Sequence, residues 1–243
     1  MYLCLALNYG SFVNTDAIAV NDGAPATPYP APLPIAGLDG VIREMTVTLK
    51  NLSHRFPADL DVLLVSPHQD AVLLMSDAGG NVPLTNVTLA FSDRATVALP
   101  DTHGIFSGLY RPTDYPPSDF FFPPAPAGPY ATQLSVFNGQ DPNGVWNLYV
   151  LDDMGQDAGL IFGGWSLAFE LEATPPELAI ANQGGQAVLS WPAASEGFVL
   201  ETKAQLSTTG AWTTVTDSPV RVGDRNFVAL DLPQHAGFFR LRK

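Results

Sequence analysis

The feature that most constrains the fold is an alternation of apolar and polar residues, repeated in short runs along the whole chain. In residues 44–51, EMTVTLKN, Met45, Val47 and Leu49 fall on one side of an extended strand and the polar residues on the other. Comparable runs, each ending at or near a turn residue, lie at 71–77, 87–93, 144–153 and 164–171. Helical periodicity over a useful window is hard to find, so the sequence predicts an all-β chain.

One run differs because it is apolar on both faces. Residues 60–65, LDVLLV, place leucine and valine side chains on both sides of the predicted strand. A strand of this kind lies in the centre of a sheet that is covered on both faces. Six or more antiparallel strands at the observed spacing favour a two-sheet β-sandwich of the jelly-roll type.

The chain is long enough for a large β-domain followed by a small one. It has 243 residues, and the segment TPP ends the pattern of the first domain near Thr174. We therefore assign residues 12–173 to the jelly-roll sandwich. Residues 174–243 carry short strand patterns typical of a small immunoglobulin-like or fibronectin-like sandwich, with Trp191 and Trp212 predicted in its core. Residues 1–11 are expected to be a leader, a truncated N-terminus or a first strand.

A proline-dense segment interrupts this rhythm at residues 112–129. Proline cannot donate to a strand ladder, so the segment predicts a long surface loop, which carries Phe120, Phe121 and Phe122.

Charge and composition exclude several classes of partner. The formal net charge of −13 repels phosphate backbones and anionic membrane surfaces, which argues against nucleic acid. No apolar run is long enough to span a membrane. The single cysteine, Cys4, allows no internal disulfide and no thiolate metal cluster.

Two ordered blocks resemble a known family. The first contains PADLDVLLVSP at 57–67 and the second runs from Asn143 to Leu171. Their shared pattern falls on His54, Asp59, Leu60, Ser66, Pro67, Gly144, Trp146, Leu148, Val150, Asp152, Gly159, Leu160, Trp165 and Leu167. This pattern is similar to the P domain (P/Homo B domain) that follows the catalytic domain in kexin-like and furin-like proprotein convertases and in many bacterial subtilisin-like proteases.

The resemblance implies a non-catalytic accessory module of a secreted bacterial protein. Its partner would be a subtilisin-like protease catalytic domain in the same or a neighbouring chain, and its location extracellular or at the cell surface. His54 would hold a loop by hydrogen bonding. The two tryptophans of the second block, Trp146 and Trp165, lie on strict alternation and are predicted in the core.

No catalytic set is apparent in the chain itself. It lacks a nucleophile turn of the Gly-Thr-Ser type, a G-x-S-x-G elbow and an H-E-x-x-H pair. The four histidines, His54, His68, His103 and His235, share no ligand spacing and are interpreted as turn and surface residues. The sequence therefore predicts that this chain is not an enzyme.

Aspartates at strand ends suggest a calcium site. Calcium takes six to eight oxygen ligands, which carboxylates and loop carbonyls supply, and bacterial P domains often bind it. The preferred ligands are Asp59, Asp93 and Asp152, and the secondary ones are Asp61, Asp77 and Asp153. The alternative is that each aspartate only caps backbone N–H groups in its turn. The loop at 152–159, DDMGQDAG, is interpreted as a hairpin first and a metal site second.

A second function class remains open. A carbohydrate-binding or adhesive β-sandwich, with a cell-surface polysaccharide as its partner, uses the same architecture. It would need a planar row of exposed aromatic side chains, for which the sequence offers Tyr110, Tyr115 and the run from Phe120 to Phe122.

Overall fold

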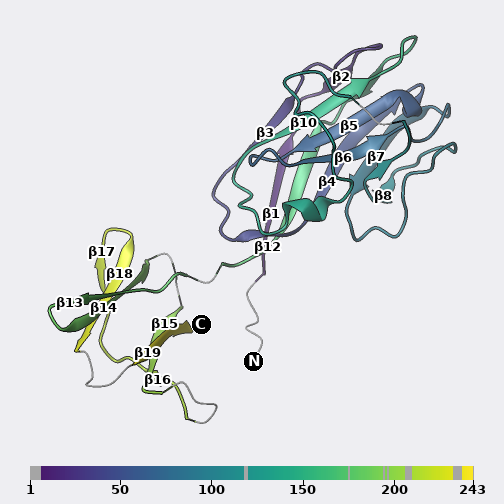
Figure 1. The fold of residues 1–243 in the computed structure, drawn as a ribbon. Helices are drawn as coiled ribbons and strands as arrows, with labels where there is room; N and C mark the ends of the chain where they lie inside the picture. Colours follow the sequence, from purple (N-terminus) through teal and green to yellow (C-terminus); the bar gives the residue numbers. More distant parts are fainter. Residues whose placement is uncertain are drawn as a thin grey trace. The chain divides into compact units, whose positions relative to one another are not determined.

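The computed structural model describes residues 7–117, 120–174, 176–193, 195, 197–205, 210–231 and 237–242. The chain forms two compact units, Met1–Thr174 and Pro175–Lys243, which are described separately (Figure 1). His235, one of the four histidines of the sequence, lies outside the described residues.

The first unit consists of strands and two short 3₁₀ helices, as the alternating pattern predicts. In chain order these are β1 (Leu7–Asn14), β2 (Ile18–Val20), β3 (Ala31–Ile35), β4 (Val41–His54), η1 (Pro57–Asp59), β5 (Leu60–Val65), β6 (Ala71–Ser76), β7 (Leu84–Phe91), β8 (Gly108–Tyr110), β9 (Thr113–Asp114), η2 (Leu134–Phe137), β10 (Gly144–Asp152), β11 (Gly159–Ile161) and β12 (Trp165–Glu172). The predicted all-β sandwich is confirmed.

Two sheets form the sandwich (Figure 1). One has seven strands in the order β1-β12-β4-β11-β2, with β7 paired to β4 and β8 to β7, and the other has five in the order β3-β10-β5-β6-β9. The core between them contains Trp146 and Trp165, both fully buried, and the ring of Trp146 packs on Phe137 and Phe169. The predicted burial of the two tryptophans is therefore confirmed.

The outer face of the five-stranded sheet is covered as well. Every residue of β5 is buried, and its outward-facing Leu63 and Val65 pack in a second cluster with Phe121 and Tyr149. Phe121 comes from the proline-dense segment, so this predicted surface loop places one ring inside the protein. Its neighbours Phe120 and Phe122 are exposed.

The first sheet begins earlier than the predicted start of the domain. β1 pairs with β12 along its whole length, from Leu7 opposite Glu172 to Asn14 opposite Trp165. The sheet thus takes in residues 7–11, for which a first strand was one of the expectations, and residues 1–6 lie outside the described residues.

The second unit is a small β-sandwich with its own core. Its strands are β13 (Ala179–Gln183), β14 (Gln186–Pro192), β15 (Val199–Lys203), β16 (Thr213–Thr214), β17 (Val220–Val222), β18 (Arg225–Asp231) and β19 (Phe238–Arg242), in sheets ordered β13-β14-β18-β17 and β16-β15-β19. Trp191 is buried in the core, as predicted. Trp212 is only partly buried, and the guanidinium of Arg240 lies 4.3 Å from the centre of its ring.

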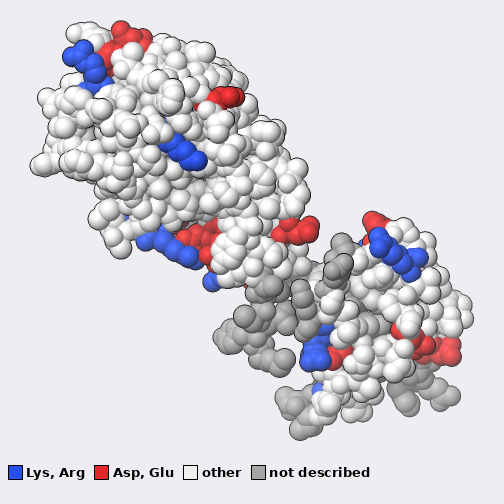
Figure 2. Space-filling model, turned by 180° about the vertical axis from the view of Figure 1, so that it is seen from behind, with Lys and Arg blue, Asp and Glu red and all other residues white. Residues whose placement is uncertain are grey.

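Charged side chains are sparse on the surface. The face in Figure 2 is mostly uncharged, with Lys, Arg, Asp and Glu in small scattered groups, in line with a chain of which 14% is charged. Among the described residues, no helix has the length and apolar character that crossing a membrane requires.

Candidate metal site

Strand pairing brings one histidine and several aspartates to one end of the sandwich. β4 ends at His54, which lies opposite Gly159 at the start of β11. β10 ends at Asp152, which lies opposite Leu60, the residue after Asp59. The backbone N–H of Asp153 donates to the carbonyl of Asp59 at 3.0 Å and joins the two turns. Residues far apart in the sequence therefore converge because their strands end together.

His54 is buried and held in a fixed orientation. Its Nδ1 lies 3.0 Å from the carbonyl oxygen of Phe56, which can only accept, so Nδ1 carries a proton and donates. Its Nε2 faces two carboxylates, 3.2 Å from Oδ2 of Asp152 and 3.6 Å from Oδ1 of Asp157. The side chains of His54 and Asp152 are fully buried, and that of Asp157 is 10% exposed.

The carboxylate of Asp157 is unusual because one of its oxygens has no hydrogen bond. Oδ1 is buried and accepts no hydrogen bond from the residues that the structure describes. Asp152 differs, since its Oδ1 accepts the backbone N–H of Met154 at 3.1 Å. One ligand atom each from His54, Asp152 and Asp157 lie within 4.8 Å of one another, which is close enough to share a metal ion.

Two further carboxylates belong to the same electrostatic environment. Burial, together with the negative charges of Asp157, Asp152 and Asp153 and against an opposing effect of His54, raises the pKa of Asp59 to about 6. Burial also raises the pKa of Asp152 and of Asp153. We call the group of His54, Asp59, Asp152, Asp153 and Asp157 the acidic cluster.

Gly159 allows this close approach of strand and ring. A Cβ atom at Gly159 would lie only 2.6 Å from the carbonyl oxygen of Ser53 and would collide with Cδ2 of His54. Only glycine therefore lets β11 pair with the end of β4 while the imidazole stays in place. Gly159, which belongs to the pattern of the second sequence block, therefore has a steric role.

The structure brings some of the predicted calcium ligands together and separates others. Asp59, Asp152 and Asp153 lie in the acidic cluster. Asp61 is buried on β5 and lines a neighbouring groove. Asp77 follows β6 at the same end of the sheet, with a left-handed backbone at φ 51°.

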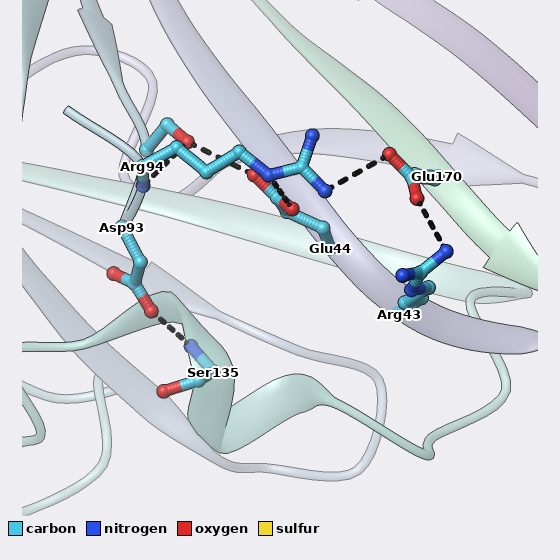
Figure 3. Close-up of polar contacts among 7 residues, drawn as sticks. Arg43, Glu44, Asp93, Arg94, Ser135 and Glu170 are labelled. Atoms are coloured by element: carbon cyan, nitrogen blue, oxygen red, sulfur yellow. Dashed lines mark hydrogen bonds and ion pairs between the residues drawn. The ribbon is translucent and has the colours of Figure 1, made fainter.

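Asp93 lies elsewhere and has a different role. Its two carboxylate oxygens accept the backbone N–H groups of Leu134 and Ser135, at 2.9 and 2.7 Å, where η2 begins. Figure 3 shows the bond from Ser135. This is the turn-capping role that the sequence left as the alternative.

The cluster only partly suits calcium. Calcium takes oxygen ligands, whereas the three closest ligand atoms include the imidazole nitrogen of His54. Asp59 and Asp153 offer carboxylate oxygens beside them. Calcium at these carboxylates stays a prediction.

His54 and Asp157 are the residues that the sequence reasoning missed. His54 was interpreted as a turn or surface residue, or as a residue that holds a loop, and Asp157 was seen only as part of a turn. The only sequence signal that could link Asp157 to His54 is indirect. Asp157 lies two residues before Gly159, and Gly159 pairs with His54. The register of β4 and β11 was needed to see it.

A groove of about 290 Å³ adjoins the cluster. Its walls come from the ends of β5 and β10 and from the proline-dense segment, and include Asp61, Asp152, Asp153, Phe120 and Phe122.

Among the described residues, the aromatic side chains that the sequence offered as a carbohydrate platform do not form a planar row. Phe120 and Phe122 meet edge to face, with an interplanar angle of 79°. Tyr110 and Tyr115 are partly buried against the core, and their hydroxyl groups donate to the carbonyls of Phe106 and Leu99. Phe121 is buried.

Comparison with known proteins gives only distant likenesses. No protein-family model matches the chain, and no curated protein does. Among solved structures it is similar to the serine protease of Aeromonas sobria, in complex with its chaperone at 15% identity and a TM-score of 0.37, and alone at 14% and 0.36. The matches cover 70% of this chain but only 27% and 28% of those chains. These neighbours come from a bacterial serine-protease system, and they assign no role to any residue here.

Proposed function

We propose that the first unit is a non-catalytic accessory module of a secreted bacterial protein and acts beside a subtilisin-like serine endopeptidase. The observation that carries the proposal is that the two sequence blocks that resemble the P domain contact each other in the fold. His54 meets Asp152, and a Cβ at Gly144 would lie 2.6 Å from Cβ of Pro67. The pattern that resembles the P domain is thus a set of packing and pairing positions.

The described histidines support a non-catalytic role. The ring of His54 contacts Phe56 and two aspartates, Nε2 of His68 contacts the carbonyl of Asp141, and His103 contacts the hydroxyl of Thr102. Within the described part of the chain, no histidine ring hydrogen-bonds to a serine hydroxyl, which a serine protease needs to activate its nucleophile. The carbohydrate-binding alternative has no aromatic platform among the rings described above.

The experiment pairs this chain with a protease. A subtilisin-like catalytic domain from the same or a neighbouring gene is expressed with the chain, without it, and with a Trp146→Ala variant that lacks the core anchor. The proposal predicts a longer half-life of protease activity at elevated temperature only with the intact chain. The purified chain alone should cleave neither casein nor dibasic peptides. Equal half-lives in all three preparations would rule out the accessory role.

A further inference from the structure

We infer that His54, Asp152 and Asp157 form a binding site for a divalent transition-metal ion of the zinc type. The inference concerns an ion that would stabilise the proposed accessory module, and it does not depend on which protease the module serves. It rests on the positions of the three ligand atoms and on the buried Oδ1 of Asp157, which accepts no hydrogen bond from the residues that the structure describes.

The first step is the proton on His54. Because the carbonyl of Phe56 requires a proton on Nδ1, a neutral imidazole directs the bare lone pair of Nε2 at Asp152 and Asp157. Three acceptor atoms then face one another with no donor between them. Such an arrangement needs either a proton, carried by Nε2 or by one of the two carboxylates, or a metal ion among the three atoms.

The second step is the carboxylate of Asp157. A proton on Nε2 would serve Oδ2 of Asp152 at 3.2 Å but would leave Oδ1 of Asp157, at 3.6 Å, without a hydrogen bond. This oxygen is buried, its side chain is nine-tenths buried, and it points at the same nitrogen. A metal ion would satisfy all three atoms at once, which a proton cannot do.

The third step is the spacing of the ligand atoms. Nitrogen and oxygen ligands lie about 2.0 to 2.2 Å from zinc, so neighbouring ligands of a tetrahedral ion are about 3.3 to 3.6 Å apart. The separations of 3.2 and 3.6 Å from Nε2 agree with this geometry. Water or Asp59, whose charge acts on the same carboxylates, would complete the coordination.

The fourth step is the support behind the ligands. A metal-binding histidine usually donates its other N–H to a carbonyl or carboxylate, and His54 does so to Phe56. The backbone N–H of Met154 holds the second oxygen of Asp152. Both ligands are therefore oriented before any ion binds.

The imidazole nitrogen Nε2 of His54 favours zinc over calcium as the bound ion. Imidazole suits zinc and related ions, whereas calcium is bound by oxygen. We therefore expect Zn²⁺ to bind here more tightly than Ca²⁺ or Mg²⁺.

The test measures melting of the full chain after removal of metal with EDTA and addition of Zn²⁺, Ca²⁺ or Mg²⁺. At Zn²⁺ about a hundredfold above its dissociation constant, Tm should rise by about 5 to 10 °C, and calorimetric titration should give one ion per chain. Co²⁺ should give the visible absorption of a tetrahedral site. In Asp157→Asn these responses should be lost while the fold, judged by circular dichroism, is kept.

Three controls make the result specific. Asp93→Asn changes a carboxylate outside the acidic cluster, His103→Ala removes an exposed imidazole, and Cys4→Ser removes the one thiol of the chain. All three should keep the full rise in Tm with Zn²⁺. His54→Gln should lose the rise in Tm with Zn²⁺. If His54→Gln fails to fold, Asp157→Asn still decides the test.

Two outcomes would overturn the inference: a larger shift with Ca²⁺ than with Zn²⁺, or a Zn²⁺ shift that Asp157→Asn retains. Neither affects the protease experiment, whose readout is the half-life of the partner enzyme. A failure of the metal site and a failure of the accessory role can therefore be told apart.

Discussion

Two acidic regions of the first unit have opposite surroundings. Around Asp93, positive partners are present: Arg94 forms ion pairs with Glu44 and Glu170, and Arg43 pairs with Glu170 at 3.0 Å (Figure 3). Asp93 itself accepts two backbone N–H groups at the start of η2. Each of these carboxylates is compensated by a partner within the chain.

The acidic cluster has four carboxylates and a single imidazole. Within the described part of the chain, no lysine or arginine forms an ion pair with Asp59, Asp152, Asp153 or Asp157. Burial removes the Asp59 carboxylate from water and, with the repulsion from the neighbouring carboxylates, raises the pKa of Asp59. The comparison shows that aspartates near strand ends in this fold have different surroundings, and that the charges of the acidic cluster lack the compensating partners present around Asp93.

The largest expected effect tests the core that supports both regions. Replacement of Trp146 or Trp165 by alanine removes a fully buried side chain and should cost about 3 to 5 kcal/mol of unfolding free energy, measured by urea denaturation. Trp212→Ala, at a partly buried position of the second unit, is the matched control with a smaller cost. If Trp146→Ala and Trp165→Ala melt like the parent, the two-sheet core is wrong.

The next largest effect is expected around Asp93, where each carboxylate has a partner within the chain. Asp93→Ala leaves the N–H groups of Leu134 and Ser135 without their acceptor and should cost about 1 to 3 kcal/mol. Because this cost comes from hydrogen bonds within the chain, it should be the same in EDTA and in metal. A cost that appears only with metal would mean that Asp93 is a ligand, as the sequence first predicted.

The third effect is the pH dependence of the metal-free acidic cluster. The folded pKa of Asp59, about 6, lies above its ordinary value of 3.8, so the folded chain binds more protons between about pH 4 and 6. The contribution of Asp59 is therefore present below pH 4 and lost as pH rises through 6. Unfolding in EDTA should show this decline, and Asp59→Asn should reduce it. An identical pH profile for both proteins would contradict the predicted pKa shift.

The smallest effect belongs to the arginine network. The side chain of Arg94 is 62% exposed, and ion pairs at such positions contribute about 0 to 1 kcal/mol. Arg94→Ala should therefore lower Tm only slightly, and high salt should lessen the difference. A loss above about 2 kcal/mol would show that this network is more than a surface contact.

The sequence was sufficient for the elements of the fold but not for the site. Alternation and two-sided burial are local signals, which is why the strands, the central position of β5 and the core positions of Trp146 and Trp165 could be predicted. The grouping of aspartates depends on register and on partners elsewhere in the chain. Asp93 follows β7 and Asp152 ends β10, yet Asp93 accepts hydrogen bonds from the backbone of η2 whereas Asp152 contacts His54. The burial of Phe121 likewise depends on a distant part of the chain, because its ring packs on the outer face of the five-stranded sheet.

The most direct test compares two matched substitutions, Asp157→Asn and Asp93→Asn, in metal-free protein at about pH 8. Each removes one negative charge and nearly preserves shape. Removing the charge of Asp157 relieves repulsion from Asp59 and Asp152, so Asp157→Asn should leave the free energy of unfolding unchanged or raise it. Asp93→Asn should lower it, because one of the two oxygens that accept the backbone N–H groups is replaced by an NH2 group, which cannot accept, and the remaining amide oxygen is a weaker acceptor. Equal destabilisation by both would contradict the distinction between an uncompensated and a compensated acidic region.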